Sequence, residues 1–151
     1  MYNELKNIKV PTTIMTNSAE NNGNIFGAVD YLNHKKDIIN TGVTIKEYEG
    51  GISYHGKSMT IDDDIAIVGS FNMDMRSAYI DTELMLVINS KDINKQLKAS
   101  MEEYEKKAAT VKNETEYSHI PEGMKMKELS DKKKNIKAWF GWAMNGLRFL
   151  F

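Results

Sequence analysis

The 151-residue sequence contains no cysteine, which excludes both a disulfide framework and a thiolate metal site. It has no apolar run approaching the roughly 20 residues of a membrane span, and its first residues lack the apolar core of a signal peptide. Basic and acidic side chains nearly balance at a net charge of -1, so no general excess of positive charge favours nucleic acid. The length and a hydrophobic content of 41% favour one globular domain, which we expect to be cytoplasmic.

The balanced net charge hides an asymmetry between the two ends of the chain. Residues 125–151 carry seven Lys or Arg and two Asp or Glu, a net of +5, which leaves about -6 for residues 1–124. Within residues 132–151, three consecutive lysines precede two Trp and three Phe. This pattern predicts a C-terminal amphipathic helix that lies on an anionic phospholipid surface. The alternative is a helix that packs on the protein's own core or on a partner.

Strand-like and helix-like patterns alternate along residues 1–108. Apolar alternation and β-branched runs predict strands over residues 8–16, 43–48, 53–61, 65–68 and 84–88. Helical periodicity predicts a helix over 25–40, with Asn24 as its N-cap and Gly42 just beyond its end, and a second helix over 92–107. This order predicts an α/β layered domain over 1–108. We expect a polar loop over 74–81 and a linker over 109–131, before the tail.

One short stretch carries side chains suited to phosphate chemistry. His55 and Lys57 lie two residues apart, and such positions point to the same face of an extended chain. Asn72 follows the next apolar run, and a hairpin would return it to the same place. A converging imidazole, ammonium and carboxamide suit a phosphate ester. The imidazole attacks phosphorus or protonates a leaving oxygen, while the other two groups hold the non-bridging oxygens.

The complete HKD signature of the phospholipase D superfamily is matched by the run His55-x-Lys57-x4-Asp62-x6-Gly69-Ser70-x-Asn72. Other segments resemble the C-terminal half of bacterial cardiolipin synthase-type enzymes, namely Thr16-Asn17-Ser18, Tyr48-Glu49, the run 72–78 and Asp81-Thr82-Glu83. Residues 8–108 therefore resemble the second catalytic half of such an enzyme. The resemblance implies a phospholipase D-like layered fold, with a mixed β-sheet flanked by helices and a single HKD lobe.

The resemblance also implies roles for individual residues. The family's site joins two HKD motifs, in which one histidine forms a phosphohistidine and the other protonates the leaving alcohol and activates the acceptor. His55 corresponds to the second-motif histidine, which more often has the acid/base role. Lys57 and Asn72 correspond to ligands of the phosphate oxygens, with Ser70 as a further donor. Glu83 corresponds to a carboxylate that orients a catalytic imidazole.

Two further positions of the signature, Asp62 and Gly69, are expected to be structural. The family's chemistry needs no metal or other cofactor, because the site lysines supply the positive charge. The chain holds one HKD motif where the family's site needs two. The second motif comes either from an identical chain about a two-fold axis or from a separate N-terminal half. Only about seven residues precede the first expected strand, where a complete lobe carries a further strand and helix, and this favours a split or truncated half.

The leading expectation is a cardiolipin synthase-like phosphatidyltransferase, peripheral at the inner face of the membrane, with a second HKD lobe and anionic phospholipid as partners. One alternative is a homodimeric phosphodiesterase or nuclease, although the acidic residues 1–124 make nucleic acid an unfavourable partner. Another is an inactive lobe that binds lipid or a partner.

Overall fold

A computed structural model describes residues 2–146, apart from the side chains of Tyr2 and of residues 142–145. Two β-sheets and five helices make up this part of the chain. The first sheet has the order β1-β2-β6-β7, with β1 (Thr13–Asn17), β2 (Thr44–Tyr48), β6 (Ala108–Val111) and β7 (Tyr117–His119). The second has the order β3-β4-β5, with β3 (Ser58–Ile61), β4 (Ile65–Gly69) and β5 (Met85–Asn89). The helices are α1 (Tyr2–Asn7), α2 (Ile25–Ile39), α3 (Met75–Tyr79), α4 (Lys91–Glu105) and α5 (Asp131–Gly146).

The first sheet begins as a parallel pair, β1 and β2, joined by α2. The side chain of Asn24 caps α2 by accepting hydrogen bonds from the amides of Phe26 and Gly27 at 3.1 and 3.2 Å. At the other end, Gly42 adopts a φ of +89° and its amide donates to the carbonyl of Ile39 at 3.0 Å. The structure therefore confirms the predicted helix and both of its ends.

The core of the first sheet contains an ion pair as well as apolar side chains. Apolar burial is concentrated in Ala28, Val29, Ile45, Tyr48, Ala108 and Ala109. Lys35 on α2 pairs with Glu47 on β2 at 2.8 Å, and both side chains are buried. Glu47 also accepts hydrogen bonds from the hydroxyls of Tyr31 and Tyr117 at 2.6 and 2.5 Å. Burial, together with the nearby Glu47 carboxylate, raises the pKa of both tyrosines far above the usual range.

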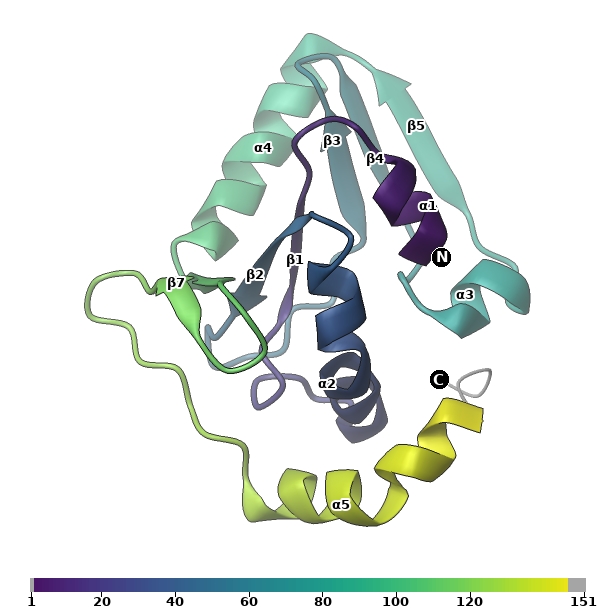
Figure 1. Cartoon of the computed structure of the whole chain (residues 1–151). Helices are drawn as coiled ribbons and strands as arrows, with labels where there is room; N and C mark the ends of the chain where they lie inside the picture. Colours follow the sequence, from purple (N-terminus) through teal and green to yellow (C-terminus); the bar gives the residue numbers. More distant parts are fainter. Residues whose placement is uncertain (1, 147–151) are drawn as a thin grey trace.

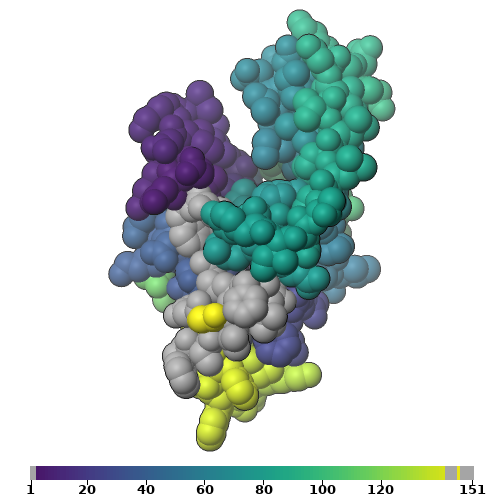
Figure 2. Space-filling view, turned by 90° about the vertical axis from the view of Figure 1, so that its right-hand side faces the viewer, coloured from purple at the N-terminus to yellow at the C-terminus, as the bar shows by residue number. Residues whose placement is uncertain are grey.

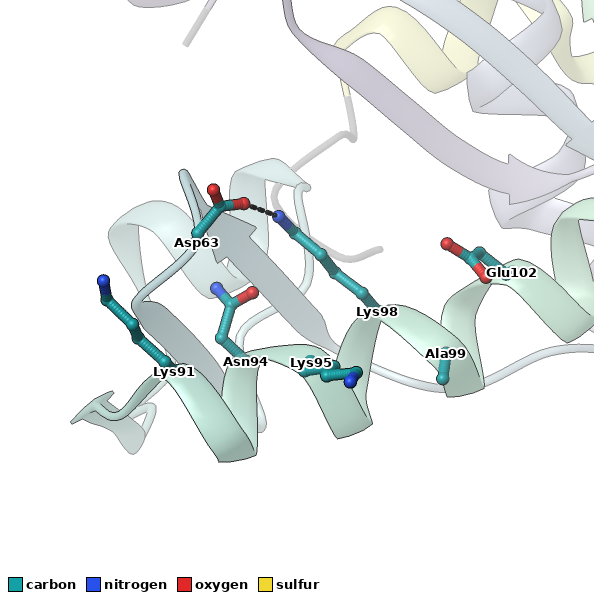
Figure 3. Close-up of a pocket in the computed structure, with 7 residues that line it drawn as sticks. All are labelled: Asp63, Lys91, Asn94, Lys95, Lys98, Ala99 and Glu102. Carbon is teal, nitrogen blue, oxygen red and sulfur yellow. Dashed lines mark hydrogen bonds and ion pairs between the residues drawn. The ribbon is translucent and has the colours of Figure 1, made fainter.

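The second sheet is a three-stranded antiparallel meander with α4 against it (Figure 1). Its first turn, at residues 62–64, places Asp62 at a φ of +47°. The buried side chain of Asn94 on α4 donates to the carbonyl of Ile65 at 2.6 Å. Lys98 lies 2.9 Å from the carboxylate of Asp63, as Figure 3 shows, and holds the pKa of that carboxyl below its usual range. Helix α4 therefore fixes the turn that joins the two motif strands.

Four sequence predictions need correction. The strand predicted over 8–16 begins only at Thr13, because Pro11 lacks an amide hydrogen and residues 8–12 have no neighbouring strand, and α1 precedes it. The strand predicted over 53–61 begins at Ser58, because side chains hold the preceding loop. The polar loop at 74–81 contains α3, whose N-cap Asp74 accepts from the amide of Ser77 at 2.7 Å.

The fourth correction concerns the linker predicted over 109–131. It contains most of β6 and all of β7, which extend the first sheet. The small residues Ala108 and Ala109 pair with Tyr48 and Glu47 and are buried there, so sheet pairing overrides the polar composition of the segment. The other elements predicted in residues 1–108 form close to the predicted positions. The result is a mixed α/β arrangement compatible with the expected layered fold, although its strands divide into two sheets.

The tail begins as the helix α5, which runs along the base of the molecule below α2 (Figure 1). The side-chain amide of Asn33 on α2 donates to the carbonyl of Gly141 at 2.9 Å. Of the predicted tail, 132–151, residues 147–151 lie outside the described residues, as do the side chains of 142–145. Within the described part of the chain, no helix combines the length and the apolar character needed to cross a membrane.

Candidate functional site

His55 and Lys57 lie on the loop between β2 and β3, and their side chains meet. The ammonium of Lys57 is 2.9 Å from Nε2 of His55 and donates to the carbonyl of His55 at 3.1 Å. His55 is exposed to solvent and Lys57 is partly buried. The backbone is irregular here, so the predicted convergence of the two side chains is achieved without the predicted strand. The pair presents an imidazole and a positive charge on the surface.

Asn17, the last residue of β1, holds the loop that carries His55. Its side-chain oxygen accepts from the amide of Tyr54 at 2.7 Å, and its side-chain nitrogen donates to the carbonyl of Tyr54 at 2.8 Å. This pair of bonds copies the pairing that a neighbouring strand would give to one residue. The residue before His55 is thereby fixed to the first sheet.

Asn21 binds the backbone of the same loop in a similar way, at Gly51 and Ile52, just before Tyr54. Its side chain accepts from the amide of Gly51 at 3.0 Å and donates to the carbonyl of Ile52 at 3.1 Å. It also donates to the side-chain oxygen of Asn17 at 3.1 Å, and both asparagines are buried. Loops 18–24 and 49–57 are therefore joined by a polar network, and buried networks of this kind hold their members in one arrangement.

A buried carboxylate lies beside this network. The hydroxyl of Ser18 donates to Oε2 of Glu49 and also accepts from the amide of Asn21 at 3.0 Å. The other oxygen of Glu49, Oε1, is buried and lies 3.5 Å from the ammonium of Lys127, without a hydrogen bond. Lys127 belongs to the segment that leads into α5, so the chain just before the tail supplies the charge that compensates Glu49.

The second cluster of predicted site residues lies at the open end of the β3–β4 hairpin, on the side of Lys57 and away from the turn at 62–64. Glu83 accepts hydrogen bonds from the hydroxyls of Ser70 and Ser77 at 2.5 and 2.6 Å. These two bonds, followed by the positive charges of Lys57 and Arg76, lower the pKa of the Glu83 carboxyl below its usual range. Glu83 is thus an ionised carboxylate that accepts from two hydroxyls, and Lys57 is close enough for its charge to lower the pKa of Glu83.

The hairpin depends on a glycine. A Cβ atom at Gly69 would lie 2.1 Å from the carbonyl oxygen of Leu84, closer than any real contact. The amide of Gly69 donates to the carbonyl of Lys57 at 3.1 Å, and the amide of Ser70 donates to that of Leu84 at 3.0 Å. Gly69 therefore permits the close approach of β4 to Leu84 and Met85, and its backbone bond to Lys57 holds the other neighbouring strand in register.

The structure brings the predicted residues together only in part. His55 contacts Lys57, and Ser70 contacts Glu83. The contacts among described residues include no hydrogen bond between Glu83 and His55, so the orienting role of Glu83 stays a prediction. The exposed side chain of Asn72 likewise has no hydrogen bond within the described residues. Asp62 lies in the turn, where its carbonyl accepts from Lys98 at 2.5 Å.

A shallow pocket of about 380 Å³ adjoins His55 and was not predicted. It is lined by Tyr48, Ile52, Ser53, Tyr54, His55, Gly56 and Tyr104. The three tyrosines form one aromatic group, with the rings of Tyr54 and Tyr104 separated by 4.6 Å between centroids. Tyr104 comes from α4, about fifty residues away in sequence, and for that reason no local pattern could indicate it. Aromatic walls with a few hydroxyls suit a small ligand that is partly apolar.

The loop supports were also missed as functional residues. Asn17 and Glu49 lie in segments that resemble the family, which was the available signal, but neither was given a role. Asn21 and Lys127 lie in polar stretches with no distinguishing pattern. Their contribution depends on contacts between segments that are more than thirty residues apart.

Comparison with known proteins gives one consistent family. The family described as "Cardiolipin synthase, PLD-like domain" matches residues 3–104. Cardiolipin synthase A of Wigglesworthia glossinidia brevipalpis is 35% identical over 68 residues, which is 45% of this chain and 14% of that protein. Cardiolipin synthase A of Yersinia pseudotuberculosis serotype O:1b is 33% identical over 78 residues, which is 52% of this chain and 16% of that protein. The chain thus matches less than a fifth of the length of these relatives.

Proposed function

The chain belongs to the phospholipase D-like domain family of cardiolipin synthase, and on this basis we propose that it provides one half of a phosphatidyltransferase site. The observation that carries the proposal is the contact of 2.9 Å between His55 and Lys57 on an exposed, clamped loop. An imidazole beside a fixed positive charge is suited to a phosphodiester, whose non-bridging oxygens are anionic. The partner lobe, which carries the first HKD motif, completes the site.

The proposed reaction proceeds in two displacements. A histidine of the partner lobe, which carries the first HKD motif, attacks phosphorus, and the bond from phosphorus to the leaving alcohol breaks as His55 gives that oxygen a proton. His55 then takes the proton of an acceptor alcohol, whose oxygen attacks the phosphohistidine and releases the first histidine. With phosphatidylglycerol as both donor and acceptor, the products are cardiolipin and glycerol. Water in place of the acceptor gives hydrolysis.

The exposed face of the second sheet supports a partner lobe. Met59 and Val87 both pair with Ile67 across the sheet, so the three side chains share one face. Met59 and Val87 are 47% and 61% exposed, and Ile61 on the same face is 45% exposed. Figure 2 shows the second sheet and α4, in blue to green, projecting from the body, with an open notch between them and the purple N-terminal segment. An exposed apolar sheet face next to the motif residues is suited to a protein partner.

The surface of α5 supports a peripheral position on the inner face of the membrane. Trp139 is 77% exposed and Phe140 is 58% exposed, and the exposed lysines Lys132 and Lys134 lie in the first turn of the same helix. Aromatic side chains partition into the interface of a bilayer, while lysine is attracted to anionic lipid. We therefore propose that the tail brings the site to its lipid substrate.

The experiment supplies the chain and a separately expressed first HKD lobe with phosphatidylglycerol liposomes and measures cardiolipin. His55→Ala should lower the rate by roughly 10²-fold or more, since it removes the proposed acid/base group. His119→Ala is the matched control, because His119 is exposed and lies outside the motif. Full activity of His55→Ala would contradict the role of His55. A symmetric dimer that cleaves simple diesters without the first lobe would instead support the homodimeric phosphodiesterase.

A further inference from the structure

The buried ammonium of Lys133, in the first turn of α5, binds the backbone of loop 18–24. It donates to the carbonyls of Ala19, Glu20 and Asn22 at 2.9, 2.5 and 3.0 Å. Three carbonyls satisfy the three donors of a lysine ammonium. Among the described residues, Lys133 forms an ion pair with the carboxylate of Glu20 alone, at 3.7 Å. Lys133 therefore recognises the path of a loop rather than a single acidic partner.

The three carbonyls flank Asn21, the residue that holds the His55 loop. The side chain of Asn21 contacts Gly51, Ile52 and Asn17, and Asn17 in turn grips both backbone groups of Tyr54. Hydrogen bonds on either side of the short backbone segment 19–22 thus connect α5 to the residue before His55. A second contact comes from the segment just before the tail, where Lys127 pairs with Glu49 at the beginning of the same loop.

We propose that Lys133 is a positioning residue: by binding the three carbonyls around Asn21, it makes the order of the His55 loop depend on the docking of α5. The tail is then a structural support of the site as well as a lipid-binding segment. This inference stands on hydrogen bonds within the chain, and only its effect on catalysis rests on the proposed function.

The test measures amide hydrogen exchange in the full chain. Lys133→Met removes the donors while keeping the length and apolar stem of the side chain. The amides of Gly51 and Tyr54, whose acceptors are the side chains of Asn21 and Asn17, should exchange at least about tenfold faster. The amides of β2 should keep their rates, because the hydrogen bonds of Lys133 go to loop 18–24 and not to the first sheet.

Two controls separate positioning from simple anchoring. Lys132→Met makes the same substitution at the exposed neighbouring residue and should change nothing. Asn33→Ala removes the hydrogen bond to Gly141 in the second half of α5 and leaves the three bonds of Lys133 in place, so it should speed exchange near Gly141 and leave Gly51 and Tyr54 unchanged. Unchanged exchange of Gly51 and Tyr54 in Lys133→Met would overturn the proposal, as would a uniform increase throughout the chain. If Lys133→Met fails to fold, Lys133→Arg keeps the positive charge but replaces the compact ammonium, whose three donors meet the three carbonyls, with a planar guanidinium that cannot match them. Gly51 and Tyr54 should again exchange faster than β2, and exchange equal to that of the unaltered chain would overturn the proposal.

Catalysis provides a second measurement. In the completed enzyme, Lys133→Met should lower kcat by roughly tenfold with little change in KM, because a looser loop places His55 correctly for less of the time. A change in KM alone would overturn the positioning role. If the unaltered chain and the first lobe form no cardiolipin, the proposed function fails while amide exchange still decides the role of Lys133.

Discussion

The two sheets differ in what they bury. The first sheet and α2 enclose an ion pair with two tyrosine hydroxyls, and each of these partners comes from the chain itself. The second sheet has α4 on one side and leaves Met59, Ile61 and Val87 exposed. The motif strands lie in the sheet that is less completely covered. The comparison indicates that the buried polar core belongs to the sheet without the HKD strands, while the sheet that contains those strands keeps an open apolar face.

The largest expected effect lies in the first sheet. Glu47→Ala leaves the ammonium of Lys35 buried without a carboxylate, and this should lower the free energy of unfolding by about 3–5 kcal/mol. Denaturant unfolding monitored by circular dichroism measures the loss. Lys46→Ala is the control on the same strand, since its pair with Glu105 is partly exposed and should contribute at most about 1 kcal/mol. Equal losses of unfolding free energy for both variants would contradict the larger contribution assigned to the buried pair.

The next effect lies in the second sheet. Gly69→Ala should cost about 1–3 kcal/mol, because the new methyl group would overlap the carbonyl of Leu84 and force β4 away from β5. Amide exchange should rise in β4 and β5 and stay unchanged in the first sheet. Gly146→Ala is the control, as no atom of the described residues lies within 4 Å of the added Cβ atom. An unaltered β4–β5 pair would contradict the close approach.

A smaller effect concerns acid. Since the folded state lowers the pKa of Glu83, its contribution to stability is present above the ordinary glutamate pKa and is lost as the pH falls through the lowered value. Titration of the Glu83 carboxyl by NMR should show this depression. Ser70→Ala should return the pKa toward its ordinary value, because it removes the largest cause. A Glu83 pKa that does not respond to Ser70→Ala would contradict the assigned hydrogen bond.

The smallest effect on the isolated chain sharpens the comparison. Val87→Lys places a charge on the exposed face and should change stability by less than about 0.5 kcal/mol. The same substitution should weaken the assembly with a first HKD lobe, measured as a raised Kd between the two. Lys95→Glu on the exposed surface of α4 is the control and should leave the Kd unchanged. An unchanged Kd for Val87→Lys would show that the partner lobe binds elsewhere.

Much of the local structure could be predicted from the sequence. Asn24 and Gly42 mark the ends of α2 because capping and positive φ have strong residue preferences, and the acidic turn at 62–64 is equally local. The pairing of β6 with β2 and the aromatic contact of Tyr104 depend on segments far apart in the chain, which no local pattern encodes. At the site, the spacing of His55 and Lys57 predicted their contact. The asparagines that fix the loop act through backbone atoms and leave no spacing to recognise.

Those asparagines have an evolutionary consequence. Asn17 and Asn21 hold Gly51, Ile52 and Tyr54 through main-chain amides and carbonyls alone. The side chains of Ile52 and Tyr54 line the pocket beside His55 and take no part in those hydrogen bonds. Substitutions there can reshape the pocket while the histidine keeps its place. Ligand preference and catalytic geometry are therefore free to diversify independently in this part of the molecule.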